Sequence, residues 1–385
     1  MIVGGGAVGS AVAYFIASRP GFAGSVTVVE RDPSFARASS ALSASSIRQQ
    51  FSTPVNIALS RFGVDFLRDA ERILAVDGTP PAVGLHERGY LFLVPPSGRA
   101  VLERVHAIQR GEGVDVALLD PAALTQRFPW LAPDGIDAAS LGLSGEGWFD
   151  GYGLMQALRR KARSLGARLV TGEVTAFRRA GRRVEAAILA DGSAIAGDWF
   201  VDAAGPWAAS IAAMLGIDLP VRARRRCVFV VACPDPLPGC PLVIDTSGVW
   251  FRPEGDRFIC GISPPADDDP DDLPLDVDHA QFDDVIWPAL AARVPAFERL
   301  KVVGSWAGYY EFNVFDHNGI VGRHPSLDNA IFANGFSGHG IQQSPAVGRA
   351  VSELILDGGF RTIDLAPLSF DRIVRGEKLL ELAII

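Results

Sequence analysis

The sequence predicts a mixed α/β and α+β protein, in which a domain built on a parallel sheet is interleaved with a second domain built on an antiparallel sheet. Residues 1–32 have the pattern of strand, glycine turn, helix and strand that is typical of a parallel α/β unit. Residues 221–308 are rich in Pro, Phe and Trp and contain short β runs such as CVFVVAC and RFICGIS, which indicate antiparallel strands. Residues 329–358 return to strand, glycine turn and helix, so we expect the parallel domain to be assembled from the start, middle and end of the chain.

The hydrophobic pattern predicts the successive elements. Val8, Val12 and Ile16 have helical spacing, and the apolar run SVTVVE is typical of a buried parallel strand that ends at Glu30. Further patterns predict helices over 54–76, 98–111 and 154–166, and strands over 87–94 and 167–177. The Asp191-Gly192 pair marks a hairpin turn. We expect the first domain to take residues 1–84, 140–220 and 309–385, and the second to take 85–139 and 221–308.

Composition restricts the class of protein. Of the 385 residues, 48% are apolar and 21% are charged, which indicates a globular chain. The formal charge of −8 argues against nucleic acid or an anionic membrane as the main partner, because both need a basic surface. No apolar run has the length of a transmembrane segment, although contact with a membrane surface stays open. We expect the acidic run Asp267–Asp272 to be a solvated loop.

Cysteine usage favours a reducing compartment. Cys227, Cys233, Cys240 and Cys260 form no C-x-x-C pair, and no His cluster has the spacing of a metal site, so we expect buried thiols and no metal. We predict a cytoplasmic protein, with peripheral contact to an inner membrane left open, because no secretory leader precedes the first strand. Only Met1, Ile2 and Val3 precede the glycines, so either the first strand is short or earlier residues are missing from this numbering.

The first glycine turn predicts a nucleotide site. Gly4, Gly6 and Gly9 form G-x-G-x-x-G between a strand and a helix, where they permit a tight turn, close approach to a pyrophosphate and close helix packing. Glu30 follows at the spacing of the carboxylate that binds the ribose hydroxyls. The alternative is a glycine turn without a ligand. NAD and FAD both fit this Rossmann-like pattern, whereas Glu30 would repel the additional phosphate of NADP.

A second glycine turn favours FAD over NAD. The segment GFSGHGIQQSP, residues 335–345, opens a helix whose N–H groups and dipole would face an electron-rich group. A reduced flavin carries negative charge at its pyrimidine end and needs such a partner, whereas NAD does not. Glycine turns before helices are common in proteins, so this feature needs support from other segments.

Several segments resemble a known family. VVERD, GEVTAF, VDAAGPWA and GFSGHGIQQ resemble the D-amino-acid oxidase superfamily of FAD enzymes, which includes sarcosine, glycine and dimethylglycine oxidoreductases. This resemblance implies a Rossmann-like FAD-binding domain with a substrate domain, of the D-amino-acid oxidase or glutathione-reductase-2 type. Longer segments, among them WAGYYEFNVFDHNGIVG, resemble the mitochondrial FAD-dependent oxidoreductase domain-containing proteins implicated in respiratory complex I assembly. The chain lacks a transit segment, so we expect a bacterial relative.

The resemblance implies a set of FAD contacts from four parts of the chain. They are Gly4, Gly6, Val8, Gly9, Glu30, Arg31, Ser39, Ser40, Ser43, Val174, Ala203, Ala204, Gly205, Trp207, Gly335, Gly338, His339, Gly340, Ile341 and Gln342. Some relatives attach FAD through a His or a Cys, but Ser43 and Tyr309 or Tyr310 stand at the matching positions, so we predict noncovalent FAD. The strand RFICGIS lacks the lysine that activates oxygen in monomeric sarcosine oxidase, which favours a dehydrogenase.

Five residues are candidates for the chemistry. Arg48 is our first choice for binding a substrate carboxylate, as a matching arginine does in sarcosine oxidase; alternatively it holds its own loop or the cofactor phosphates. Arg252 is a second candidate, with a surface strand position as the alternative. Strand alternation predicts that only one of Tyr309 and Tyr310 faces the substrate. His339 could stabilise charge, act as a base or merely cap a helix.

The predicted function is hydride transfer from the C–H next to the nitrogen of a small amine or amino acid to FAD. Tyr90, Trp250 and Phe251 could form an apolar cage for a methylated amine, or could belong to the sheet core. The second partner would be an electron acceptor, namely oxygen, a quinone or an electron-transfer protein. The alternatives are a flavoprotein that mainly docks on a protein partner in respiratory-complex assembly, an FAD-dependent 2-hydroxy-acid dehydrogenase and an NAD enzyme.

Overall fold

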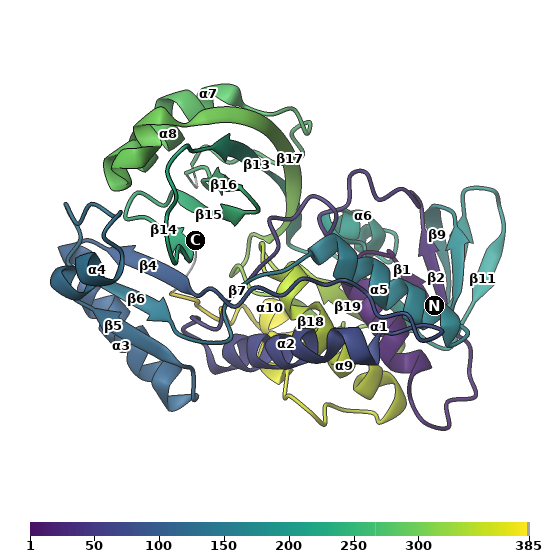
Figure 1. Cartoon of the computed structure of the whole chain (residues 1–385). Helices are drawn as coiled ribbons and strands as arrows, with labels where there is room; N and C mark the ends of the chain where they lie inside the picture. Colours follow the sequence, from purple (N-terminus) through teal and green to yellow (C-terminus); the bar gives the residue numbers. More distant parts are fainter. Residues whose placement is uncertain (266, 383–385) are drawn as a thin grey trace.

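The computed structural model describes residues 1–265 and 267–382, and one of its two large sheets has six strands (Figure 1). The strand order is β18–β19–β12–β1–β2–β8; neighbours from β19 to β8 are parallel, and β18 is antiparallel to β19. The bounds are β1 (Ile2–Val3), β2 (Thr27–Glu30), β8 (Arg168–Thr171), β12 (Phe200–Asp202), β18 (Ile320–Arg323) and β19 (Ala330–Asn334). The parallel sheet is therefore assembled from the start, middle and end of the chain, as predicted.

An eight-stranded sheet forms the other large layer. Its order is β17–β13–β16–β15–β14–β4–β6–β5, and its neighbours are antiparallel except for the parallel pair of β14 and β4. The bounds are β4 (Tyr90–Val94), β5 (Val116–Leu119), β6 (Ala138–Gly142), β13 (Val221–Ala232), β14 (Leu242–Ile244), β15 (Trp250–Glu254), β16 (Arg257–Gly261) and β17 (Lys301–Asn313). This sheet confirms the predicted combination of a parallel and an antiparallel layer.

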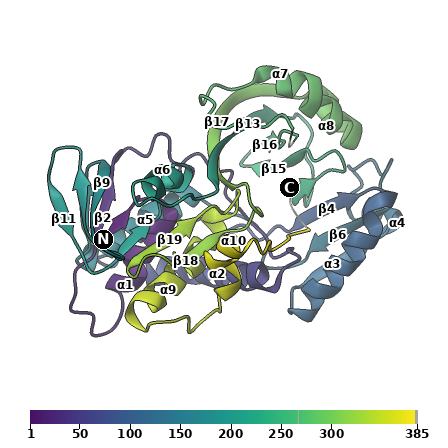
Figure 2. The ribbon, with the colours of Figure 1, turned by 180° about the vertical axis from the view of Figure 1, so that it is seen from behind.

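Helices cover the two layers at different ends of the molecule. α1, α2, α5 and α9 lie with the parallel sheet, α3 and α4 lie beside β5 and β6, and α7 and α8 lie over β13, β16 and β17 (Figures 1 and 2). The bounds are α1 (Ala7–Ala17), α2 (Pro54–Ile73), α3 (Arg99–Gly111), α4 (Pro121–Arg127), α5 (Gly151–Ser164), α6 (Ala208–Ala213), α7 (His279–Gln281), α8 (Trp287–Arg293), α9 (Gly340–Leu356) and α10 (Asp371–Arg375).

Two small sheets complete the described fold. β9 (Val174–Ala180), β10 (Arg183–Leu189) and β11 (Ala194–Ala196) form an antiparallel sheet, and the predicted hairpin turns between β10 and β11 at Asp191 and Gly192. β3 (Ser46–Ile47) pairs with β7 (Gly147–Trp148) and fixes the end of the serine-rich segment that follows β2.

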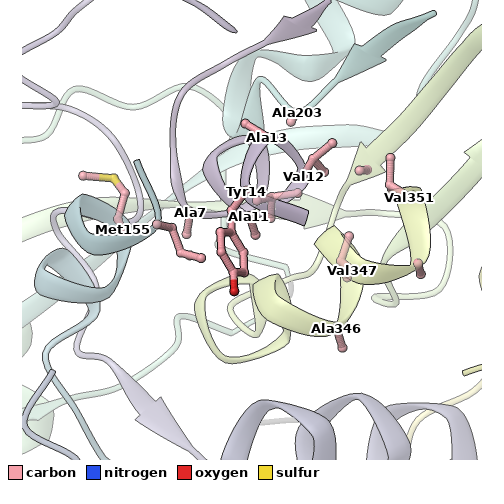
Figure 3. Packing of buried hydrophobic residues seen from close by; sticks show 14 of the residues in the cluster. Ala7, Ala11, Val12, Ala13, Tyr14, Met155, Ala203, Ala346, Val347 and Val351 are labelled. Atoms are coloured by element: carbon pink, nitrogen blue, oxygen red, sulfur yellow. The ribbon is translucent and has the colours of Figure 1, made fainter. Parts of the chain in front are cut away.

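The core of the parallel layer forms where α1 packs against α9. α1 is buried on nearly every side, and Tyr14 lies near Val347 and Ala346 of α9 while Met155 approaches from α5 (Figure 3). The two helices meet at backbone distance, because a Cβ atom on Gly348 would lie 2.6 Å from the Cβ of Ala11. This contact fixes the start of α9 relative to the start of α1.

Some sequence predictions need correction. α2 ends at Ile73, before the predicted residue 76, and β4 begins at Tyr90, after the predicted residue 87. The acidic run is not simply solvated, because the side chain of Asp269 is only 7% exposed. The four cysteines are free thiols, of which Cys233 is partly exposed. β6 and β17 cross the predicted domain boundaries, and the division itself stays a prediction. No helix of the described residues is long and apolar enough to span a bilayer.

We predict that Gly348→Ala lowers the free energy of unfolding by about 1–3 kcal/mol, because the new methyl group overlaps Ala11 in a packed interface. Gly111→Ala is the matched control, since Gly111 also lies in a helix but has no neighbour within 4 Å of a built Cβ. The control should gain up to about 1 kcal/mol from helix propensity. Urea unfolding of both variants measures the two effects, and equal stability changes would contradict the close packing.

Candidate active site

The first glycine turn brings the end of β1 to backbone distance from the segment after β12. Gly4 has φ +95°, and a Cβ atom there would lie 2.4 Å from the carbonyl oxygen of Ala203. A Cβ atom on Gly9 would lie 2.0 Å from the carbonyl oxygen of Gly4. The turn and the start of α1 can therefore take these positions only because both residues lack a side chain.

A cavity of about 620 Å³ lies at the carboxyl ends of β1, β2 and β12, next to the N-terminus of α1. Parallel α/β sheets bind their ligands at this edge, where helix N-termini offer free N–H groups. Predicted cofactor residues line it, namely Gly4, Gly6, Val8, Glu30, Arg31, Ser39, Ser40, Val174, Ala203, Ala204, Gly205 and Trp207.

Glu30 is held at the end of β2 by backbone donors. Its two carboxylate oxygens accept hydrogen bonds from the N–H of Gly5 at 2.8 Å and from the N–H of Asp32 at 2.9 Å. The guanidinium of Arg31 lies over the Trp207 ring at 4.0 Å and is 3.9 Å from the carboxylate of Glu173. The Glu30 carboxylate and the stacked Arg31 guanidinium thus form one end of the cavity. Glu30 stands where the glycine pattern places the carboxylate that binds a ribose.

The serine-rich segment closes the cavity above the helix N-terminus. The hydroxyl of Ser40 accepts a hydrogen bond from the N–H of Ala7 at 3.0 Å, which caps the first turn of α1. The buried hydroxyl of Ser39 has no partner among the described residues. Because a buried polar atom without a partner is costly, Ser39 fits a ligand that offers a hydrogen-bonding oxygen, such as a pyrophosphate.

A second cavity of about 110 Å³ adjoins the first, and Ala7, Val8, Ser39, Ser40 and Glu311 line both. Predicted residues in its lining are Val8, Ser39, Ser40, Ser43, Trp250, Tyr309, Tyr310, Gly338, Gly340 and Ile341. The two glycine turns, which are far apart in the sequence, therefore border one continuous space.

The turn before α9 packs directly on Tyr310. Gly338 has φ +94°, and a Cβ atom there would lie 2.5 Å from the Tyr310 ring. Tyr310 pairs with Arg224 in the sheet, whereas Tyr309 pairs with Arg225 and points the other way. The hydroxyl of Tyr309 donates to the carbonyl of Leu273 at 2.8 Å, so the two tyrosine side chains lie on opposite faces of the strand. Both residues nevertheless border the second cavity, so which of them faces a substrate stays a prediction.

Arg48 and His339 lie behind the turn and line neither of these two cavities. The Arg48 guanidinium donates to the carbonyl of Gln50 at 2.5 Å, lies 2.9 Å from His339 Nε2 and packs over the Phe51 ring. This placement fits the alternative in which Arg48 holds its own loop. Burial and the charge of Arg48 lower the pKa of His339 to about 3, so its imidazole is neutral near pH 7 and accepts a hydrogen bond from Arg48.

The remaining predicted residues support the site from outside it. Arg252 is 4% exposed, which excludes the surface position, and it donates to the carbonyl of Ala44 at 2.6 Å in the serine-rich segment. Gln342 accepts a hydrogen bond from the N–H of Arg48 at 2.8 Å. Gly9, Gly335 and Gln342 do not line either cavity, and neither do Tyr90 and Phe251, which lie in the sheet core. Of the suggested aromatic cage, Trp250 alone borders the space.

Two buried carboxyl groups escaped the sequence analysis. Glu311 borders both cavities, and burial raises its pKa to about 8; N–H groups of Gly335 and Phe336 lower it, and the charge of Asp202 raises it. Burial also raises the pKa of Asp202 to about 8, and one of its carboxylate oxygens has no partner among the described residues. Both groups therefore favour the protonated form near neutral pH in the cofactor-free protein.

Arg226 of β13 also lines the second cavity and was not predicted. Arg226 and Glu311 reach the site through the pairing of β13 with β17, which joins residues about eighty positions apart. The available signal in the sequence was weak: one charged residue among the aromatic residues of GYYEF, and the basic run VRARRR. Strand register decides which of these charges faces the cavity.

The family model for FAD dependent oxidoreductases, named DAO, matches residues 1–354. The chain belongs to this family. It is 44% identical to FAD-dependent oxidoreductase domain-containing protein 1 from Xenopus laevis, over 100% of this chain and 84% of the relative. It is 30% identical to glycine oxidase from Geobacillus kaustophilus, over 96% of both chains. L-proline dehydrogenase from P. horikoshii has a similar structure, with a TM-score of 0.84, 26% identity and coverage of 98% of both chains.

These comparisons confirm the predicted family and its cofactor, FAD. The first cavity of this DAO family member offers a helix N-terminus, the Glu30 carboxylate and the unpartnered Ser39 hydroxyl, which fit such a dinucleotide. The expectation of a bacterial relative is wrong, since proteins 44% identical to the chain come from Xenopus laevis and Bos taurus.

We predict that Gly338→Ala weakens FAD affinity about tenfold to a hundredfold, because the methyl group would displace the Tyr310 ring and strain the turn. Gly358→Ala is the control: Gly358 also has positive φ, +74°, but no atom lies within 4 Å of a built Cβ. Fluorescence titration of the FAD-free protein measures both affinities. Equal affinities for the two variants would mean that the turn before α9 does not shape the cofactor site.

The raised pKa of Glu311 predicts a pH-dependent stability of the FAD-free protein. Its pKa is about 8 when folded against 4.5 as the ordinary value, so this group costs stability as pH rises through that interval. Glu311→Gln should gain stability relative to the wild type between about pH 5 and pH 8.5, by more than the ~1.4 kcal/mol of one pKa unit. Unfolding in urea at both pH values tests this, with the exposed Glu71→Gln as control; parallel pH curves for wild type and Glu311→Gln would refute it.

Proposed function

We propose that this protein is an FAD-dependent amine or amino-acid dehydrogenase or oxidase. It would take a hydride from the C–H next to the nitrogen of a small substrate. The observation that carries this proposal is the lining of the second cavity, where the turn proposed to hold the flavin ring, at Gly338 and Ile341, meets Tyr310, Trp250 and Arg226. Aromatic rings suit an alkylated amine, and a guanidinium suits a carboxylate, so the lining is complementary to a small amino acid.

The names of similar family members support this substrate class. Relatives of the chain include glycine oxidase and dimethylglycine dehydrogenase, and a similar structure is that of L-proline dehydrogenase. Each name contains a small amino acid. FAD, when bound, accepts the hydride; the protein has to orient the substrate and exclude water.

The residues predicted for the cofactor keep their proposed roles. The N-terminus of α9, at Gly340 and Ile341, borders the second cavity and presents the positive end of a long helix to it, which favours negative charge there. Ser43 borders the same cavity and offers no nucleophile of the kind used for flavin attachment, so we propose that FAD is bound noncovalently. The division into an FAD-binding and a substrate domain belongs to the same proposal.

We propose an electron acceptor other than oxygen. In the described part of the chain, neither cavity has a lysine in its lining. A cationic side chain beside the flavin would stabilise the negative charge that develops on oxygen. The imidazole of His339 is neutral, and the cation that lines the second cavity, Arg226, is already paired with Asp269. A quinone or an electron-transfer protein therefore fits this site better.

Anaerobic reduction tests the function. We expect one of sarcosine, dimethylglycine, glycine, L-proline or D-alanine to remove the visible absorbance of the bound flavin, whereas L-lactate leaves it unchanged. Dithionite is the control that proves the flavin reducible. Aerobic assays of the active amine should then give faster turnover with a soluble quinone than with oxygen.

The alternatives give different results in this panel. Reduction by L-lactate and by no amine would favour a 2-hydroxy-acid dehydrogenase. If no compound reduces the flavin while respiratory subunits copurify with the protein, the protein is better explained as an interaction factor, and the proposed enzyme function is wrong. The names of the relatives at 44% identity specify no substrate, so this experiment has to distinguish the proposed enzyme from the alternatives.

A further inference from the structure

The acidic segment lies along a free edge of the strand that carries Arg226. β16 pairs with β13 only at residues 229–231, so the first half of β13 has an open edge opposite β17. The N–H of Asp272 donates to the carbonyl of Ala223 at 2.9 Å, and Asp271 forms an antiparallel bridge with Arg224. The segment therefore extends the sheet beside the second cavity.

Asp269 is the member of this segment that reaches the cavity arginine. Both of its carboxylate oxygens accept hydrogen bonds from the two terminal nitrogens of Arg226, each at 2.8 Å. The two side chains are 7% and 10% exposed. This parallel pair of bonds is the geometry with which a guanidinium binds any free carboxylate, including that of an amino acid.

Arg226 is the one cationic residue in the described lining of the second cavity. Its guanidinium lies 5.1 Å from the centre of the Tyr310 ring, which in turn contacts the turn at Gly338. The Arg226 Nε atom is buried without a partner among the described residues. Arg226 also donates to the main-chain carbonyl of Arg225, at 2.8 Å. Arg48 and Arg252, by contrast, lie outside the lining.

We propose that Arg226 binds the carboxylate of the substrate, and that the carboxylate of Asp269 binds the Arg226 guanidinium when no substrate is present. This inference rests on the proposed function in that the substrate is an amino carboxylate. A buried cation without a counter-ion is costly, so the pair opens most readily when another carboxylate takes the place of Asp269. An amine without a carboxylate cannot make this exchange.

The segment is built to release Asp269 without leaving the sheet. Asp267 and Asp268 are exposed and form no ion pair in the described part of the chain, so like-charge repulsion opposes docking. Arg224 holds Asp271 at 2.7 Å and also lies 3.2 Å from the carboxylate of Asp269. When a substrate carboxylate takes Arg226, Asp269 therefore keeps Arg224 as a counter-ion and the segment stays on the sheet, so the acidic run acts as a retained gate at the substrate site.

Binding of benzoate to the FAD-loaded protein, followed by the change in the visible flavin spectrum, tests the exchange without turnover. Asp269→Asn removes the internal competitor and should tighten benzoate binding about tenfold, whereas Arg226→Gln should weaken it by at least about tenfold. Asp267→Asn makes the same charge change at an exposed position and should bind benzoate as the wild type does. Benzamide, which has the same shape without the charge, should distinguish none of the four proteins.

Several results would overturn the exchange. Equal benzoate affinity for Asp269→Asn and Asp267→Asn, wild-type affinity for Arg226→Gln, or no response of any form to benzoate would each do so. If Arg226→Gln does not fold, the double variant Arg226→Gln with Asp269→Asn removes both charges; it must bind benzamide but not benzoate. If an amino acid reduces the flavin with the same KM in the Arg226 variant as in the wild type, the exchange is refuted and the proposed function stands. If benzoate binds as expected but no amine reduces the flavin, the proposed function is refuted and the exchange stands.

Discussion

The site depends on backbone segments that approach each other with no side chain between them. Gly4 lies against Ala203, and Gly340 lies so close to Glu311 that a Cβ atom would be 2.8 Å from its carboxylate. These contacts bring the turns before α1 and α9 to one space, although they are more than three hundred residues apart in the chain. Because α1 and α9 also pack at Gly348, the positions of the two helix N-termini are fixed together.

Several ionisable groups near the meeting point of the two turns favour their neutral forms. Burial favours protonated Glu311 and Asp202, and burial beside Arg48 keeps His339 neutral. Arg226 is charged but carries its own counter-ion, Asp269. A ligand therefore enters a site whose charges are already balanced, and only a ligand that replaces an existing charge, or is itself neutral there, avoids a large desolvation cost.

Local patterns predicted the parts of the site that depend on local geometry. Gly4, Gly9 and Gly338 are needed because the turns there require positive φ or leave no space for a side chain. Such turns can be recognised from a few neighbouring residues of the sequence. The position of Arg226 against Asp269 is not local, because it depends on where β16 ends along β13 and on which loop fills the open edge. The sequence shows both charge runs but not their register, so it predicts only a solvated loop for the acidic run.

Two buried arginines, Arg48 and Arg226, differ in the contacts that hold them. The main-chain N–H of Arg48 donates to Gln342, and its guanidinium contacts His339, so it ties the serine-rich segment to the start of α9. Glu146 holds the next two residues of that segment through their N–H groups, at 2.6 and 3.0 Å. A ligand that took the Arg48 guanidinium would break this contact with the turn before α9. In our proposal a ligand takes Arg226 instead, exchanges one carboxylate for another and leaves that turn in place.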